Sequence, residues 1–115
     1  MAVVSNDFTV MGASSAPVNG RKIDHIKDVA TRRGMPLVFL GESSGARMPD
    51  TMGAGGIGNA RRPTQYLRMR ETPWVSAVLG HCYGSASWYA VLSDFMVMRK
   101  GAAMATTSGC HEAAQ

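Results

Sequence analysis

Two apolar runs, each ending abruptly in a turn of small residues, constrain the fold of this chain more than any other feature. The first run is Pro36–Leu40, which leads into Gly41–Arg47, and the second is Trp74–Leu79, which leads into Gly80–Ser87. A short apolar run that stops at small residues is typical of a buried strand that delivers a backbone turn to a site. Two such strands in one sheet can aim backbone N–H groups at a single oxygen. That arrangement is an oxyanion hole, which acyl chemistry requires because negative charge develops on a carbonyl oxygen.

The segments around these runs alternate between strand and helix patterns. Strands are expected at 3–10, 95–98 and, more weakly, 102–107, with a short helix around Trp88 and a polar helix over 59–71. The alternation predicts an α/β fold with a parallel sheet and right-handed crossovers.

A further helix is indicated by apolar residues that recur at helical spacing, beginning with Ile23 and Ile26. Asn19 is the expected N-cap, and Gly34 is expected to end the helix. The basic residues of this segment lie on its other side and are expected to face solvent: Arg21, Lys22, Lys27, Arg32 and Arg33.

The length of the chain allows one core, so residues 1–115 are expected to form a single domain. No apolar run approaches the roughly 20 residues that span a bilayer, and no membrane partner is expected. Cys82 and Cys110 are the only cysteines. Because the N-terminus lacks a signal-peptide pattern, they are expected to be reduced thiols in a cytoplasmic protein.

The net charge of +4 admits two kinds of anionic partner, a nucleic acid or a phosphorylated small molecule. With 7% aromatic residues and no recognisable nucleic-acid motif, nucleic acid is not the expected partner. The glycine-rich loop Gly53–Gly58 does not have the spacing of a P-loop.

Several other chemistries fit the residues poorly. His81 and Cys82 are adjacent on a strand end and point to opposite sides, so they are not expected to form a catalytic dyad, and Cys82 is expected to be buried. No Cys or His pair has metal-ligand spacing, so no metal is expected. Glu42 is a candidate acid or base, although a strand-end carboxylate that bonds to backbone is the favoured interpretation.

Four blocks of the sequence, in order, resemble the carboxyltransferase (β) subunits of biotin-dependent acyl-CoA carboxylases such as propionyl-CoA carboxylase. Ser5–Gly12 resembles their Asp-Phe-Thr-Val-x-Gly-Gly block, and Ser43–Arg47 resembles their Ser-Gly-Gly-Ala-Arg turn. Gly80–Ala86 resembles Gly-Pro-Cys-Ala-Gly-Gly-Ala, and Leu92–Phe95 resembles Leu-Thr-Asp-Phe. The resemblance extends over 2–109 and implies a partial N-terminal-type carboxyltransferase domain of the crotonase-like fold, which is built of repeated ββα units.

The resemblance also implies that an acyl-CoA thioester lies across the two turns. Its oxygen would accept hydrogen bonds from the backbone of Ala46, Gly84 and Ser85, the implied catalytic residues. The implied substrate-binding residues are Ser44, Gly45, Arg47, Tyr83 and Ala86. Arg47 and the arginines at 61, 62, 68 and 70 are candidates for holding the phosphates of coenzyme A.

The chain departs from the family pattern beside the second turn. Ser85 replaces a glycine, His81 a proline, Tyr83 an alanine and Trp88 a tyrosine. A backbone donor survives such a replacement, whereas the bulky side chains are expected to reshape the acyl pocket. Trp88 also occupies the position of a hydratase glutamate, which argues against hydratase chemistry.

The implied reaction is transfer of a carboxyl group between carboxybiotin and the α-carbon of an acyl-CoA. Biotin would be carried by a partner, a biotin carboxyl carrier or biotin carboxylase component, and a homo-oligomer is expected. The second domain that receives carboxybiotin is absent from these residues, so the chain alone is expected to be silent as a carboxylase. Decarboxylation of a malonyl-type thioester, and a non-catalytic assembly subunit or fragment, are the alternatives.

Overall fold

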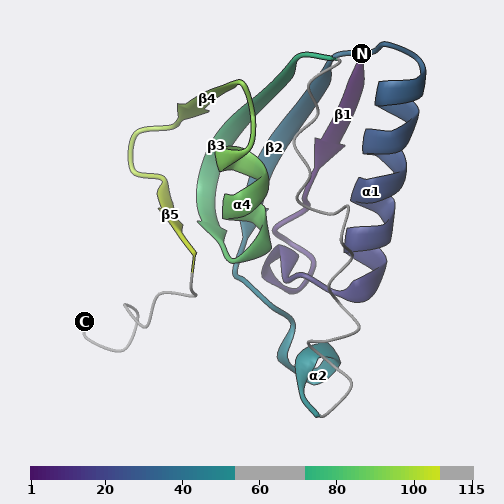
Figure 1. Ribbon diagram of the computed structural model, residues 1–115. Coiled ribbons are helices and arrows are strands. Elements are labelled where there is room, and N and C mark those ends of the chain that lie inside the picture. The colour runs from purple at the N-terminus through teal and green to yellow at the C-terminus, as the bar shows by residue number, and fades with distance from the viewer. Residues whose placement is uncertain (54–71, 107–115) are drawn as a thin grey trace.

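A parallel sheet with helices packed on one face positions the two turns (Figure 1). The computed structural model describes residues 1–53 and 72–106. These residues form a sheet in the order β1-β2-β3-β4, with β5 also paired to β3, and every pairing is parallel as the sequence predicted. The strands are β1 (Ala2–Ser5), β2 (Leu37–Ser43), β3 (Trp74–Tyr83), β4 (Phe95–Met98) and β5 (Ala103–Ala105).

The helices within the described residues are η1 (Met11–Ala13), α1 (Pro17–Arg32), α2 (Met48–Thr51) and α4 (Ser85–Val91). Helix α1 begins earlier than expected, with Ala16 rather than Asn19 at the N-cap position. Pro17 accounts for this start, because its fixed φ suits the first helical turn and its missing N–H would have no helical acceptor there. The helix expected over 59–71 lies outside the described residues. No described helix is both long and apolar enough to cross a membrane.

Strand β1 is shorter than the expected strand 3–10. Asp7 accepts hydrogen bonds from both the N–H and the hydroxyl of Thr9, at 2.9 and 2.6 Å, and this local turn ends the extended conformation. Strand β3 is longer than expected and runs through Gly80 to Tyr83. Here β3 bulges against β2, since Val78 pairs with Gly41 but Cys82 pairs with Ser43.

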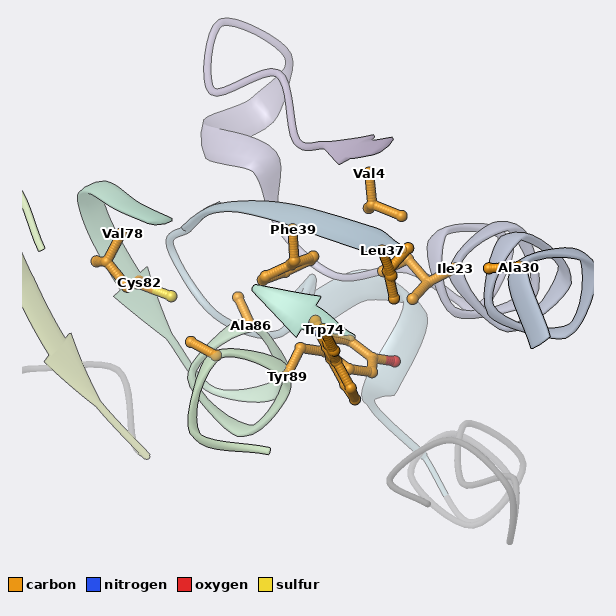
Figure 2. Packing of buried hydrophobic residues seen from close by; sticks show 11 residues of the cluster. Val4, Ile23, Ala30, Leu37, Phe39, Trp74, Val78, Cys82, Ala86 and Tyr89 are labelled. Carbon is orange, nitrogen blue, oxygen red and sulfur yellow. The ribbon is translucent and has the colours of Figure 1, made fainter. Parts of the chain in front are cut away.

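The core lies between the sheet and the helices α1 and α4. Phe39 of β2 packs against Tyr89 of α4 with ring centroids 5.5 Å apart, and Trp74 and Leu37 are buried beside them (Figure 2). Ile23 and Ala30 extend the same cluster onto α1. Because β2 alternates buried and half-buried residues, Ser43 at its end also points to the helix-covered side.

The expectation that Lys27 faces solvent is wrong, because the residue is buried. Its side chain is 6% exposed, and its ammonium lies 5.2 Å from the centroid of the Trp74 ring and 5.8 Å from that of Tyr89. Burial lowers the pKa of Lys27, while the nearby Asp24 carboxylate acts in the opposite direction. Lys27 follows Ile23 by four residues, so helix geometry places both on the core-facing side.

The other face of the sheet exposes an apolar surface. Val3, Val38, Val75 and Phe95 lie side by side across four strands, and of these Val3, Val75 and Phe95 are exposed. Parallel sheets are ordinarily covered on both faces. This open face therefore has the character of a surface that packs against further protein.

Candidate active site

The first turn follows the end of β2 and is held by hydrogen bonds on both sides. Gly45 has φ +105°, a conformation that side chains rarely adopt. The hydroxyl of Ser43, which is fully buried, accepts from the N–H of Gly45 at 3.1 Å and donates to the carbonyl of Ala13 at 3.0 Å. The turn is therefore fixed to the segment that precedes α1.

Three backbone hydrogen bonds join the turn to that segment. The N–H of Ser44 donates to Gly12 at 2.8 Å, and the N–H of Ser15 donates to Gly45 at 2.7 Å. The N–H of Arg47 donates to Ser15 at 2.9 Å, which completes a parallel bridge between Ser15 and Ala46. In such a bridge the N–H of Ala46 itself points away from Ser15. Within the described residues, this N–H has no hydrogen-bond partner.

The second turn joins β3 to α4 at Gly84, which has φ +63° and ψ −126°. Its N–H donates to the carbonyl of Ala105 in β5 at 3.1 Å, and its carbonyl accepts from the Ser87 hydroxyl at 2.7 Å. The pairing of β3 with β5 thus gives the Gly84 N–H a backbone acceptor, and a role of this group as a donor to the substrate stays a prediction. Ser85 begins α4, and its N–H has no acceptor among the described residues.

The two turns touch each other. A Cβ atom built on Gly84 would lie 3.5 Å from the Cα of Gly45 and 4.0 Å from the backbone nitrogen of Ala46. The hydroxyls of Ser15 and Ser85 lie 2.6 Å apart and link the segment before α1 to the start of α4. The structure therefore brings Ala46 and Ser85 to the same edge of the sheet, with glycines at the point of contact.

The implied substrate-binding residues differ in what their side chains do. Arg47 lies along its own loop, with its Nε 3.4 Å from the Ser14 hydroxyl and 3.6 Å from the Asp50 carboxylate. The side chain of Ala86 is buried in the core, and its role in substrate binding stays a prediction. Ser44 is exposed, and Tyr83 is half-buried. The arginines at 61, 62, 68 and 70 lie outside the described residues.

Two departures from the family pattern form a pair beside the second turn. The Nδ1 of His81 and the hydroxyl of Tyr83 are 3.1 Å apart, and their rings lie 5.5 Å apart. Phe8 contacts the same imidazole, with ring centroids 6.3 Å apart. These three rings form an aromatic group next to Gly84, on the side of the strand opposite Cys82.

Cys82 is not a nucleophile in this geometry. It is fully buried and free, and burial raises the pKa of its thiol to about 11, with a smaller contribution from the Glu42 carboxylate. A thiol with so high a pKa is protonated at neutral pH, which agrees with the expectation of a buried structural cysteine. Among residues 1–53 and 72–106, no three His, Cys, Asp or Glu side chains are grouped as a metal site would need.

Asp94 bonds to backbone at the start of β3, and Glu42 lies against a glycine of the same strand. Asp94 accepts from the N–H of Trp74 at 2.8 Å, and its own N–H donates to the Trp74 carbonyl at 2.7 Å. Asp94 thereby joins the start of β4 to the start of β3. Glu42 lies across Gly80, where an added Cβ would approach its Oε1 to 2.6 Å.

Sequence reasoning missed the residues that hold the turns in place. Ser15 bonds to both turns, and Ala105 occupies the Gly84 N–H, yet both are small residues in unremarkable stretches. No local pattern distinguishes them, because their contacts join segments far apart in the sequence.

The comparison with known proteins identifies the family. The family described as "Carboxyl transferase domain" matches residues 1–111. A propionyl-CoA carboxylase beta chain of Saccharopolyspora erythraea is 35% identical over 98 residues, which are 85% of this chain and 18% of that protein. A methylmalonyl-CoA decarboxylase subunit alpha of Propionigenium modestum is 36% identical over 96 residues, which are 82% of this chain and 18% of that protein.

Solved structures agree with this assignment. The crystal structure of transcarboxylase 12S with hydrolysed methylmalonyl-coenzyme A bound matches with a TM-score of 0.68 and 31% identity, over 91% of this chain and 21% of that one. The crotonase-like fold expected from the sequence is confirmed by these structural neighbours. The chain spans about a fifth of the length of these relatives. With both turns in place and the match covering almost every residue, the chain belongs to the carboxyl transferase domain family.

Proposed function

We propose that this chain is the acyl-CoA-binding part of a carboxyltransferase, and that the N–H groups of Ala46 and Ser85 hold the thioester oxygen. The observation that supports this most directly is the contact between the two turns, in which Gly84 lies against Gly45 and Ala46. Both N–H groups lack a partner within the described residues. Relatives are named for propionyl-CoA and methylmalonyl-CoA, which are thioesters of the required kind.

The chemistry of such a site is stabilisation of an enolate. When a carboxyl group joins or leaves the α-carbon of a thioester, negative charge moves onto the thioester oxygen in the transition state. Donors fixed beforehand stabilise that charge without reorganising, and loss of one such donor costs about 10²–10³ in rate. Ser43, Ser15 and the β3–β5 pairing supply the rigidity that fixed donors need.

The carboxyl donor in this proposal is carboxybiotin, brought by a biotin carboxyl carrier or biotin carboxylase component. Within the described residues the two turns account for one oxyanion site, so the site for the biotin ureido group lies on other protein. A homo-oligomer is part of the proposal, and the exposed apolar face of the sheet supports further assembly. A cytoplasmic location and a single partial domain over 1–115 stay proposals from the sequence.

A second candidate function is decarboxylation of a malonyl-type thioester. It is favoured by the likeness to the methylmalonyl-CoA decarboxylase subunit alpha. Loss of carbon dioxide needs the same thioester oxygen to be held but no carboxyl donor. Decarboxylation therefore needs only the proposed oxyanion site of the two turns, whereas carboxylation needs a site for carboxybiotin as well.

Two assays test the proposal on the purified chain. Calorimetric titration with acetyl-, propionyl- and malonyl-CoA should show binding, weakened by salt where arginines contact the phosphates. Methylmalonyl-CoA should be decarboxylated slowly, whereas propionyl-CoA with carboxybiotin should give no product without a partner chain. Carboxylated product from the isolated chain would contradict the placement of the biotin site on other protein. Failure of every thioester to bind would contradict the proposed function itself.

A further inference from the structure

Ser15 forms hydrogen bonds to both turns of the site. Its backbone holds the first turn, because its N–H donates to Gly45 at 2.7 Å and its carbonyl accepts from the N–H of Arg47 at 2.9 Å. Its hydroxyl reaches the second turn, where it lies 2.6 Å from the hydroxyl of Ser85. A single half-buried residue thus joins the segment that carries Ala46 to the start of α4.

The contact between the two hydroxyls supplies a directional link between the turns. The pairing of β2 with β3 ends before the two proposed donors. Beyond that pairing, Gly84 lies against Gly45, and such a contact limits how closely the turns approach but favours no orientation. A hydrogen bond between hydroxyls favours both a distance and an angle. The contact between Ser15 and Ser85 therefore restricts how Ser85 is turned relative to the first turn.

The hydroxyl of Ser85 is a departure of this chain from the family pattern, which has a glycine there. The second turn therefore carries a side chain beside its proposed donor N–H. Ser15 is the hydrogen-bond partner of that side chain, and residues 1–53 and 72–106 contain no other partner for it. The link depends on both serines, so removal of either hydroxyl removes it.

We infer that Ser15 is a positioning residue of the proposed oxyanion site, because its hydroxyl orients Ser85 so that the N–H groups of Ser85 and Ala46 converge on one oxygen. The inference rests on the proposed function, and it assigns Ser15 no contact with the substrate. Donors to a developing charge must be in place before the reaction, and a misplacement of about 1 Å costs up to about 10²-fold in rate. Loss of the Ser15 hydroxyl should therefore affect the transition state more than the bound substrate.

Amide resonances of the full chain without ligand test the link itself. Ser15→Ala keeps both backbone hydrogen bonds of this residue and removes only its hydroxyl. The substitution should shift the amide resonance of residue 85 in a ¹H–¹⁵N spectrum. The same substitution should leave that resonance in place when Ser85→Ala is already present, because the hydrogen bond is then already lost. Ser15→Thr retains a hydroxyl and should leave the resonance near its wild-type position.

Decarboxylation of methylmalonyl-CoA tests whether the link serves the proposed site. Ser15→Ala should lower kcat by about tenfold and change KM by less than about twofold, as expected when a transition-state interaction is weakened. Combining Ser15→Ala with Ser85→Ala should lower kcat no further, because both remove the same hydrogen bond. Ser93→Ala is the matched control, since the Ser93 hydroxyl donates to Ala90 at 2.6 Å beyond the other end of α4. The control should leave kcat and KM unchanged.

Two results would overturn the inference. The first is a resonance of residue 85 that responds to Ser15→Ala equally with and without the Ser85 hydroxyl, or does not respond at all. The second is a kcat that Ser15→Ala lowers no more than Ser93→Ala does. The amide comparison needs no substrate, so it decides whether Ser15 links the turns even where no thioester binds. Failure of every thioester to bind would instead contradict the proposed function.

Discussion

At the scale of single residues, Gly84 decides whether the two donors can meet. Its φ of +63° and ψ of −126° disfavour any side chain, and a Cβ there would lie in van der Waals contact with the Cα of Gly45 at 3.5 Å. Gly34 has nearly the same φ, +62°, but nothing lies within 4 Å of an added Cβ. The two glycines therefore share a positive φ and differ in their contact with the site.

The matched variants Gly84→Ala and Gly34→Ala use this difference. Both should lose unfolding free energy, on the order of 1–2 kcal/mol or more, because a side chain is strained at positive φ. Only Gly84→Ala should weaken acyl-CoA binding, by at least about tenfold, since relief of the strained φ and ψ at this position shifts the donor turn that lies against Gly45 and Ala46. Chemical denaturation and calorimetry measure the two effects. Equal acyl-CoA affinity in the two variants would show that the turn contact does not form the site.

Cys82 provides a second test at this scale. With its pKa raised to about 11 from 9.0, the folded protein should hold about a hundredfold less thiolate at pH 8 than the unfolded chain. Iodoacetamide should therefore label Cys82 slowly in the folded state and rapidly in denaturant. Cys110→Ser removes the other thiol from the measurement. Rapid labelling of the folded variant would mean that Cys82 is accessible and reactive.

At the scale of elements, helix α1 and the start of β3 meet through Lys27. Burial lowers its pKa below the ordinary 10.5, so the folded state releases this proton at a lower pH than the unfolded chain. Between those two pKa values the unfolded state binds more protons, and stability therefore rises with pH. The raised pKa of Cys82 acts oppositely, because stability falls as pH rises from 9.0 towards 11.

Lys27→Met isolates the lysine contribution. The difference in unfolding free energy, wild type minus variant, should increase as pH rises towards 10.5 and stay constant near neutrality. Denaturation at a series of pH values in a Cys82→Ala background removes the opposing effect of the thiol. A pH-independent difference would contradict the burial of the ammonium between Trp74 and Tyr89.

Helices and strands were predictable where a pattern of neighbouring residues indicates them. The apolar run and the small residues after it located β2, and β4 matched the expected 95–98. Lys27 was misplaced because its chemical type suggested solvent, while its four-residue spacing from Ile23 placed it in the core. The short helix α2 was missed, since Met48–Thr51 is a single turn with no periodicity to detect.

At the scale of the whole molecule, the sequence predicted that the two turns would meet. It did not predict which backbone N–H groups of the turns have no acceptor within the described residues. Both turns end neighbouring parallel strands, so their meeting follows from topology. The Gly84 N–H is occupied by Ala105, which lies in a different strand, and the Ser15–Ser85 contact joins residues 70 positions apart. Such contacts depend on the packed fold, and a single sequence contains no local signal for them.

The open face of the sheet extends this view to assembly. Among the described residues, a parallel sheet with one apolar face exposed, and with β1 and β4 as edge strands, is incomplete as a structural unit. This agrees with a chain that spans about a fifth of the length of its relatives. Further protein packed on these surfaces would also be the source of the biotin half of the site in the proposed function.

In the proposed site the N–H groups of Ala46 and Ser85 share one thioester oxygen. Titration of the ¹⁵N-labelled chain with propionyl-CoA, followed by the amide resonances, measures this sharing. We expect the Ala46 and Ser85 amide protons to shift downfield together, with the same apparent Kd, while the Gly84 amide proton stays bonded to Ala105 and moves little. Saturable binding of propionyl-CoA that leaves the Ala46 and Ser85 resonances in place would contradict it.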